Sequence, residues 1–168
     1  TGAGFVLNNE MDDFSARPGY PNAYGLVQGE ANAIQPGKRM LSAMTPSIVE
    51  DPEGELLLVL GSPGGATIIT NVFQQMSNVL DFGMGIRQAV NAPRLHHQHL
   101  PDRIQYERAS LPREVIAALE AMGHTVEERY RGGDVYPHIG DIQAIMRLPD
   151  GTLAGASDLR RGGAAVGY

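Results

Sequence analysis

The chain has 168 residues, with 13 Lys and Arg against 19 Asp and Glu and a formal net charge of −6. This length predicts one soluble domain over 1–168 with a sizeable core, and the absence of cysteine excludes disulfides, thiolate zinc sites and a cysteine nucleophile. The acidic balance, with Lys38 as the single lysine, argues against a nucleic-acid partner, and no apolar run is long enough to predict a membrane span.

The N-terminal part is predicted to contain little regular structure. The apolar run 5–7 predicts a short strand that ends in an acidic group formed by Glu10, Asp12 and Asp13. Residues 17–37 are rich in proline and glycine and lack an apolar period, which predicts a long loop. Loops of this length usually act as lids or are disordered.

A strand, a glycine turn and a helix are predicted next. Strands are expected at 45–49 and 56–60, joined by a turn at 51–54. Because 56–60 is uninterrupted apolar sequence, it predicts a buried strand. The segment G-S-P-G-G at 61–65 follows, and then apolar residues recur at helical spacing over 68–80.

The remaining elements carry similar local signals. Helices are expected at 85–92 and 112–122, and strands at 103–107, 124–130, 141–148 and 152–156. Gly123 follows the second of these helices as a stop signal, and Pro149-Asp150-Gly151 predicts a hairpin between the last two strands. Strands flanked by helices predict a layered α/β or an α+β fold.

The segment G-S-P-G-G is the strongest candidate for chemistry. Glycines let the backbone approach a ligand, and the start of the helix supplies unpaired N–H donors that stabilise a phosphate or an oxyanion. No G-K-[ST] sequence follows, so a phosphate-binding P-loop is not expected. The alternative is a tight turn that needs glycine for its backbone angles.

Three further groups have both a chemical and a structural interpretation. The acidic group at 10–13 could hold a cation or a substrate ammonium, or be a solvated turn. The histidines of 96–99 do not have zinc spacing, so packing or contacts with substrate are favoured over a metal. Thr1 could be a terminal nucleophile whose own amine acts as the base, but its glycine-rich surroundings carry no specific signal.

Six motifs, taken together, resemble the small subunit of the gamma-glutamyltranspeptidase family. They occur in the order of the family and extend from one end of the chain to the other. The motifs are N-N-E-M-D-D-F-S (8–15), P-N-A-Y-G-L (21–26), L-S-A-M-T-P (41–46), G-S-P-G-G (61–65), N-A-P-R-L-H-H-Q (91–98) and G-A-S-D-L-R (155–160).

The resemblance implies an α+β fold of the N-terminal nucleophile hydrolase type, an αββα sandwich of two sheets between helices. The family's precursor cuts itself into a large and a small subunit, and the freed terminal threonine attacks the γ-glutamyl amide with its amine as base. The acyl-enzyme then passes the γ-glutamyl group to water or to an amino-acid or peptide acceptor. No cofactor and no metal are implied.

The resemblance also assigns roles to residues by position. Gly64 and Gly65 match the oxyanion hole, which agrees with their place between a strand and a helix. Glu10 and Asp13 match the carboxylates that hold the α-ammonium of the γ-glutamyl group, and an ammonium requires acceptors of opposite charge.

Two more residues are carried over, and one position departs from the family. Tyr24 matches the aromatic residue of the family's lid loop, here residues 17–37. Ser42 matches one of two adjacent hydroxyl residues that bind the α-carboxylate, and Ala43 stands where many members have the second. Loss of that hydrogen bond to a charged group costs about 1.5–3 kcal/mol, so weaker glutamyl binding or altered substrate choice is expected.

The front of the chain also departs from the family. The family's nucleophile opens a Thr-Thr-His-like segment a few dozen residues before the stretch that matches 4–15, and that segment is not present. Thr1 is therefore not expected to be the nucleophile. The chain resembles the C-terminal part of the small subunit, a partial sandwich that lacks the first strands, and alone it is expected not to turn over a γ-glutamyl substrate.

The expected partners are the large subunit of the same precursor, glutathione and related γ-glutamyl compounds, and amino-acid or peptide acceptors. By its family, the protein is expected in the periplasm or secreted. Two alternatives remain open: an acylase of the same fold that acts on other amides, and a non-catalytic relative that serves in binding or assembly. Intact Gly64 and Gly65 argue against the second alternative.

Overall fold

The computed structural model describes residues 2, 4, 7–129 and 138–167. Contacts divide the chain into two compact units, Thr1–Ala43 and Met44–Tyr168. The single domain over 1–168 stays a prediction. Thr1, most of the strand expected at 5–7 and the end of the strand expected at 124–130 lie outside the described residues, and Leu7 has no regular structure.

Turns and two short 3-10 helices make up the first unit. These helices are η1 (Glu10–Asp13) and η2 (Glu30–Asn32). Residues 17–37, which the sequence predicts as a loop, contain η2, turns and isolated bridges. This segment folds back on itself, because the Gly19 N–H donates to the Gln28 carbonyl at 2.8 Å.

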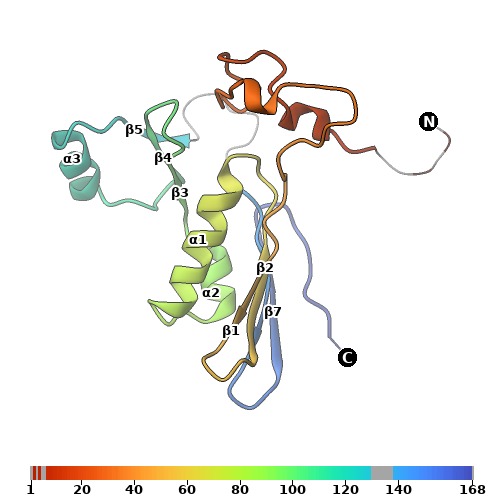
Figure 1. The fold of residues 1–168 in the computed structure, drawn as a ribbon. Coiled ribbons are helices and arrows are strands. Elements are labelled where there is room, and N and C mark those ends of the chain that lie inside the picture. The colour runs from red at the N-terminus through yellow and green to blue at the C-terminus, as the bar shows by residue number, and fades with distance from the viewer. Residues whose placement is uncertain (1, 3, 5–6, 130–137, 168) are drawn as a thin grey trace. The chain divides into compact units, whose positions relative to one another are not determined.

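A four-stranded antiparallel sheet forms the centre of the second unit (Figure 1). Its order is β1 (Ser47–Glu50), β2 (Leu56–Gly61), β6 (Gln143–Arg147) and β7 (Leu153–Ser157). The two expected hairpins are confirmed, since β1 pairs with β2 and β6 with β7. The pairing of β2 with β6 joins these hairpins into one sheet, although they are far apart in the sequence.

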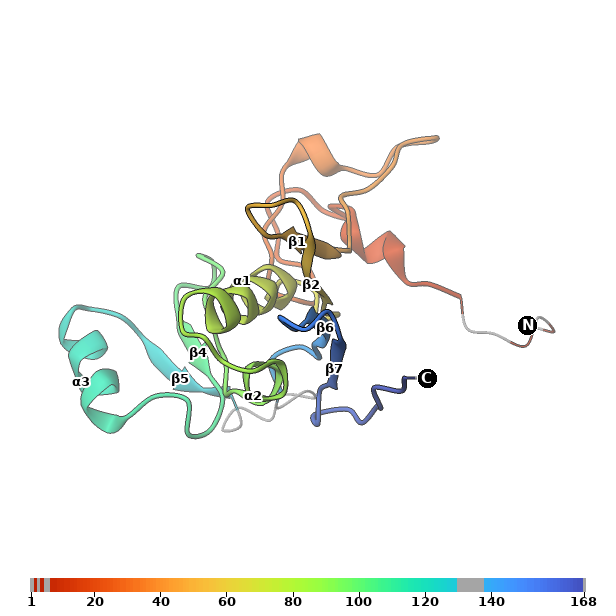
Figure 2. The ribbon, with the colours of Figure 1, turned by 90° about the horizontal axis from the view of Figure 1, so that it is seen from below.

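Two helices, α1 (Thr67–Leu80) and α2 (Ile86–Asn91), lie on the same face of this sheet (Figure 2). The core between these layers consists of Leu58, Leu60, Ile68, Val72, Ile86, Val90, Ile142, Ala144 and Ala156. The prediction that 56–60 is a wholly buried strand is only partly right: Leu57 and Val59 are half-buried and Leu56 is 37% exposed. Side chains alternate between the faces of a sheet and the helices cover one face, so Leu57 and Val59 lie on the uncovered face, while Leu56 is the first residue of the strand.

A smaller three-stranded sheet belongs to the same unit. It contains β3 (Leu95–His96), β4 (Ile104–Tyr106) and β5 (Val126–Glu128), with β3 antiparallel and β5 parallel to β4. The helix α3 (Arg113–Ala121) connects β4 to β5 and confirms the helix expected at 112–122. Within the described residues, no helix is both long and apolar enough to cross a membrane.

Candidate active site

The acidic group at the start of the first unit forms a close pair of carboxylates. Glu10 and Asp13 are the first and last residues of η1, and side chains three residues apart eclipse each other in a 3-10 helix. A hydrogen bond between the Glu10 and Asp13 carboxyl groups raises the pKa of Glu10, and burial and then the nearby charge of Asp13 raise it further. A bound cation would relieve this repulsion, so the pair has the chemistry of an ammonium site.

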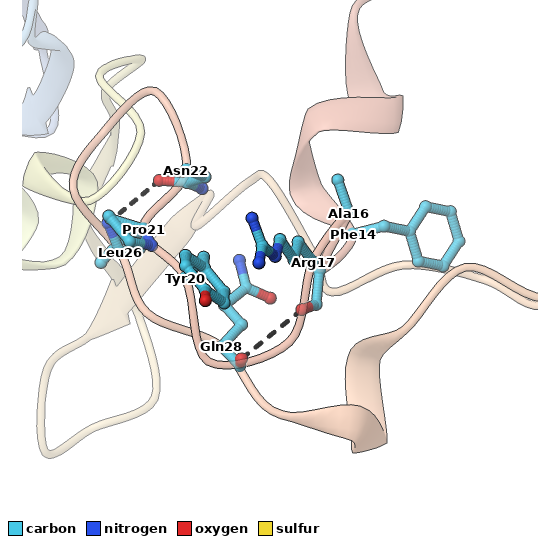
Figure 3. A pocket seen from close by; sticks show the side chains of 9 residues that line it. Phe14, Ala16, Arg17, Tyr20, Pro21, Asn22, Leu26 and Gln28 are labelled. Carbon is cyan, nitrogen blue, oxygen red and sulfur yellow. Dashed lines mark hydrogen bonds between the residues drawn. The ribbon is translucent and has the colours of Figure 1, made fainter.

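Residues 14–28, which contain Tyr24, fold around a small pocket of their own (Figure 3). The side-chain oxygen of Asn22 accepts hydrogen bonds from the backbone N–H groups of Tyr24 at 2.9 Å and Leu26 at 3.0 Å. These bonds fix the tip of the loop in a turn that presents the Tyr24 ring at the surface, 46% exposed. An ordered loop with an exposed aromatic tip is suited to cover a bound substrate.

The other predicted residue of the first unit, Ser42, is exposed and lies in a segment without regular structure. Four of the predicted site residues, Glu10, Asp13, Tyr24 and Ser42, therefore belong to the first unit. Of these four, the structure brings Glu10 and Asp13 together. Gly64 and Gly65 belong to the second unit.

The glycine turn lies between the end of β2 and the start of α1, as the sequence predicts. Gly64 has φ +142° and Gly65 has φ +56°, values that other residues rarely adopt. The Gly64 carbonyl accepts hydrogen bonds from the Thr67 N–H at 3.1 Å and the Thr67 hydroxyl at 2.9 Å. Among the described residues, neither glycine N–H donates a hydrogen bond, so both can stabilise negative charge on a substrate oxygen.

Four charged side chains form a cluster in the interior of the second unit. Arg94 donates to Asp158 at 2.5 Å, and Arg160 donates to Asp158 at 3.0 Å and to Glu107 at 2.5 Å. Arg94 and Asp158 are almost fully buried, with side chains 3% and 0% exposed. Buried charges of this kind persist only when they are paired and fully hydrogen-bonded.

The electrostatics of the cluster follow from burial and pairing. Burial alone would raise the pKa values of Glu107 and Asp158, but hydrogen bonds and nearby charge from Arg160, Arg94 and backbone N–H groups hold them below their usual range. Burial lowers the pKa of Arg94, and the neighbouring Arg160 lowers it further. A guanidinium stays protonated in proteins and both carboxyl pKa values lie below their usual range, so all four groups are charged at neutral pH.

The histidine segment packs into the fold. His96 is buried, with Nδ1 2.8 Å from the Thr70 hydroxyl and Nε2 2.8 Å from the Gln98 side-chain oxygen. Burial lowers the pKa of His96, so its ring is neutral at pH 7. His97 instead contacts Asp102 at 3.1 Å. In the ranges that the structure describes, no three metal-binding side chains converge on one point.

Sequence reasoning missed the charged cluster and a buried asparagine, Asn71. The cluster was missed because Arg94, Glu107 and the pair Asp158 and Arg160 lie on three segments that only the fold brings together. Asn71 and Gln75 did leave a signal: they fall on the apolar face of α1, where core residues are expected, and both are 1% exposed. A polar residue at a core position of an amphipathic helix usually has a specific partner.

The sheets and helices make this an α+β protein, and its similarity to solved structures gives it the N-terminal nucleophile hydrolase fold, as predicted. The sequence profile described as Gamma-glutamyltranspeptidase matches residues 1–168, and the chain belongs to this family.

Similar proteins support this assignment. The chain is 49% identical over 158 residues to the glutathione hydrolase proenzyme of Escherichia coli (strain K12), covering 94% of this chain and 26% of the relative. It is 50% identical over 167 residues to the proenzyme of the same name from Pseudomonas aeruginosa, covering 98% and 28%. The structure of a gamma-glutamyltranspeptidase from Pseudomonas nitroreducens complexed with L-DON matches with a TM-score of 0.83 and 50% identity, covering 100% of this chain and 83% of that chain. The chain thus spans little more than a quarter of the length of these two curated relatives.

Proposed function

We propose that the whole protein transfers the γ-glutamyl group of glutathione and related γ-glutamyl amides to water, or to amino-acid or peptide acceptors. The observation that carries this proposal is the pair of unengaged N–H groups at Gly64 and Gly65, in a chain of the gamma-glutamyltranspeptidase family. The experiment that tests it is release of glutamate from glutathione by the whole protein expressed from its gene. Release of acids only from amides without a γ-glutamyl group would favour an acylase instead.

The proposed reaction proceeds through a threonine acyl-enzyme. The threonine hydroxyl adds to the γ-carbonyl carbon while the terminal amine takes its proton, and negative charge develops on the carbonyl oxygen. The N–H groups of Gly64 and Gly65 stabilise that charge. The C–N bond then breaks, the amine leaves with a proton, and water or an acceptor amine attacks the acyl group in the same way.

The carboxylates of Glu10 and Asp13 are proposed to hold the α-ammonium of the substrate. Their contact within η1 creates a site of concentrated negative charge, which a bound ammonium offsets. Ser42 is proposed to bind the α-carboxylate, and Tyr24 to cover the site from the loop 17–37. Each of these roles concerns binding, so their loss should affect KM more than kcat.

Replacing Asp13 with asparagine is expected to raise KM for the γ-glutamyl donor by about 10- to 100-fold, because a charge-assisted hydrogen bond contributes about 1.5–3 kcal/mol. The measurement is steady-state glutamate release by the whole protein. Asp12→Asn is the matched control, since Asp12 lies in the same 3-10 helix and is exposed. Equal KM values for the two variants would contradict the role of Asp13.

The main sheet has an exposed apolar face on the side that α1 and α2 do not cover, and this face is suited to bind a partner. Ile48, Val59 and Ile145 lie in register across β1, β2 and β6 on the face opposite the helices, and Ile48 is 70% exposed. Exposed apolar surface of this kind marks an interaction site. We infer that the large subunit, which the greater length of the relatives allows for, covers this face.

Maturation of the precursor can be followed by intact mass and N-terminal sequencing. The whole protein, which we place in the periplasm or outside the cell, is expected to yield two polypeptides that remain associated. The smaller one should contain the residues described above and begin with threonine, because the terminal amine is the proposed base. A single uncut polypeptide that releases no glutamate would instead identify a non-catalytic relative.

A further inference from the structure

A buried asparagine, Asn71, contacts the residues on both sides of the glycine turn at 64–65. Asn71 is one helical turn after Thr67 on the same face of α1. Its side-chain N–H group donates to the Ser62 hydroxyl at 3.2 Å and to the Thr67 hydroxyl at 3.4 Å. Since Ser62 precedes Gly64 and Gly65 while Thr67 follows them, one amide group connects the two sides of the turn.

A second segment, residues 139–142, packs against the same amide. Gly140 has φ +69°, and a Cβ atom added there would overlap with the Asn71 amide and lie 2.7 Å from the Ser62 hydroxyl. The N–H of Asp141 also donates to the Ser62 hydroxyl, at 3.3 Å. This close approach requires glycine, and it limits the positions that the Asn71 side chain can take.

The buried charged cluster fixes this segment in place. The Ile139 carbonyl accepts from Arg94 at 2.7 Å, and the Ile139 N–H donates to Glu107 at 2.9 Å. At the other end, the Ile142 N–H donates to Asp158 at 2.9 Å. The support behind Asn71 is therefore a short backbone segment held at both ends by buried, charge-assisted hydrogen bonds.

Within the part of the chain that the structure describes, the buried amide of Asn71 is not fully hydrogen-bonded, which lowers the stability of the folded protein. Its side-chain oxygen is buried and has no hydrogen-bond partner among the described residues, which is unfavourable in a protein core. An apolar side chain of similar size would avoid that cost at this core position. We propose that Asn71 is a positioning residue, which aims the N–H groups of Gly64 and Gly65 through Ser62 and Thr67. This inference rests on the proposed role of the two glycines.

The first test compares two leucine variants of the whole protein. Asn71→Leu removes the amide and keeps the size, and it is expected to lower kcat for glutamate release about 10- to 100-fold while KM stays within about threefold. Gln75→Leu is the matched control, because Gln75 is equally buried one turn further along α1 and has an unpartnered side-chain N–H group within the described residues. Its kcat is expected to stay within about threefold of the wild type.

The second test does not depend on activity. In protein labelled with 15N-glycine, the order parameters of the Gly64 and Gly65 amides are expected to fall from about 0.85 to below about 0.6 in Asn71→Leu and to stay unchanged in Gln75→Leu. Unchanged order parameters in Asn71→Leu, or an equal fall of kcat in both variants, would overturn the proposal. If the wild type releases no glutamate, the proposed function fails, and the order parameters alone decide whether Asn71 positions the turn.

Discussion

Replacing Asp158 with alanine is expected to lower the free energy of unfolding of the whole protein by about 3–5 kcal/mol. The Asp158 carboxylate accepts hydrogen bonds from Arg94 at 2.5 Å, from Arg160 at 3.0 Å and from the Ile142 N–H at 2.9 Å. Alanine leaves Arg94 charged in a site that water does not reach. The measurement is unfolding in urea, followed by circular dichroism.

The control for this prediction is an exposed ion pair in the same unit. Arg103 and Glu127 lie 2.9 Å apart, with side chains 39% and 46% exposed. Glu127→Ala is expected to cost at most about 1 kcal/mol, because water and salt screen such a pair. A loss for Asp158→Ala no larger than that for Glu127→Ala would show that the buried cluster does not stabilise the fold.

Replacing Gly64 with alanine is expected to lower kcat for glutamate release by about 10²- to 10³-fold, the effect of losing one oxyanion donor. A Cβ atom at Gly64 would overlap with the Thr67 hydroxyl and lie 3.3 Å from the Gly140 Cα atom. The backbone angle of Gly64, φ +142°, is also strained for alanine. The turn must therefore shift, and the Gly64 N–H no longer points at the substrate oxygen. The measurement is single-turnover glutamate release by the whole protein.

A neighbouring glycine supplies the control. Gly61 belongs to the same motif, but a Cβ atom there meets nothing within 4 Å, and its backbone continues β2. Gly61→Ala is expected to keep kcat within about twofold of the wild type. Wild-type kcat in Gly64→Ala, or an equal loss in both variants, would exclude Gly64 from the oxyanion hole.

The charged cluster and the glycine turn both contact residues 139–142. The charged cluster holds residues 139–142, and that segment packs against Asn71 and Gly64. Loss of Asp158 should therefore reach the glycine turn as well as the core. Substitutions in contact with the same segment are expected to be non-additive.

Several parts of the fold and of the candidate site could be predicted from the sequence because their signals are local. The helices α1 and α3 followed from apolar spacing and from the residues at their ends, and the hairpins from turn residues within a few positions of each strand. The position of Gly64 and Gly65 between a strand and a helix followed in the same way. The spacing of Glu10 and Asp13 was visible too, although only the 3-10 helix shows why it brings them together.

Other features were decided by tertiary structure alone. The pairing of β2 with β6 joins segments about eighty residues apart, and no local pattern specifies such a partner. Helices on one face of the main sheet decide that Leu58 is buried while its neighbour Val59, on the opposite face, is only half-buried. The charged cluster arises only where three separate segments meet in the core, and there burial makes pairing necessary. The sequence by itself thus determined the elements and the glycine turn, and packing of distant segments decided what surrounds and supports that turn.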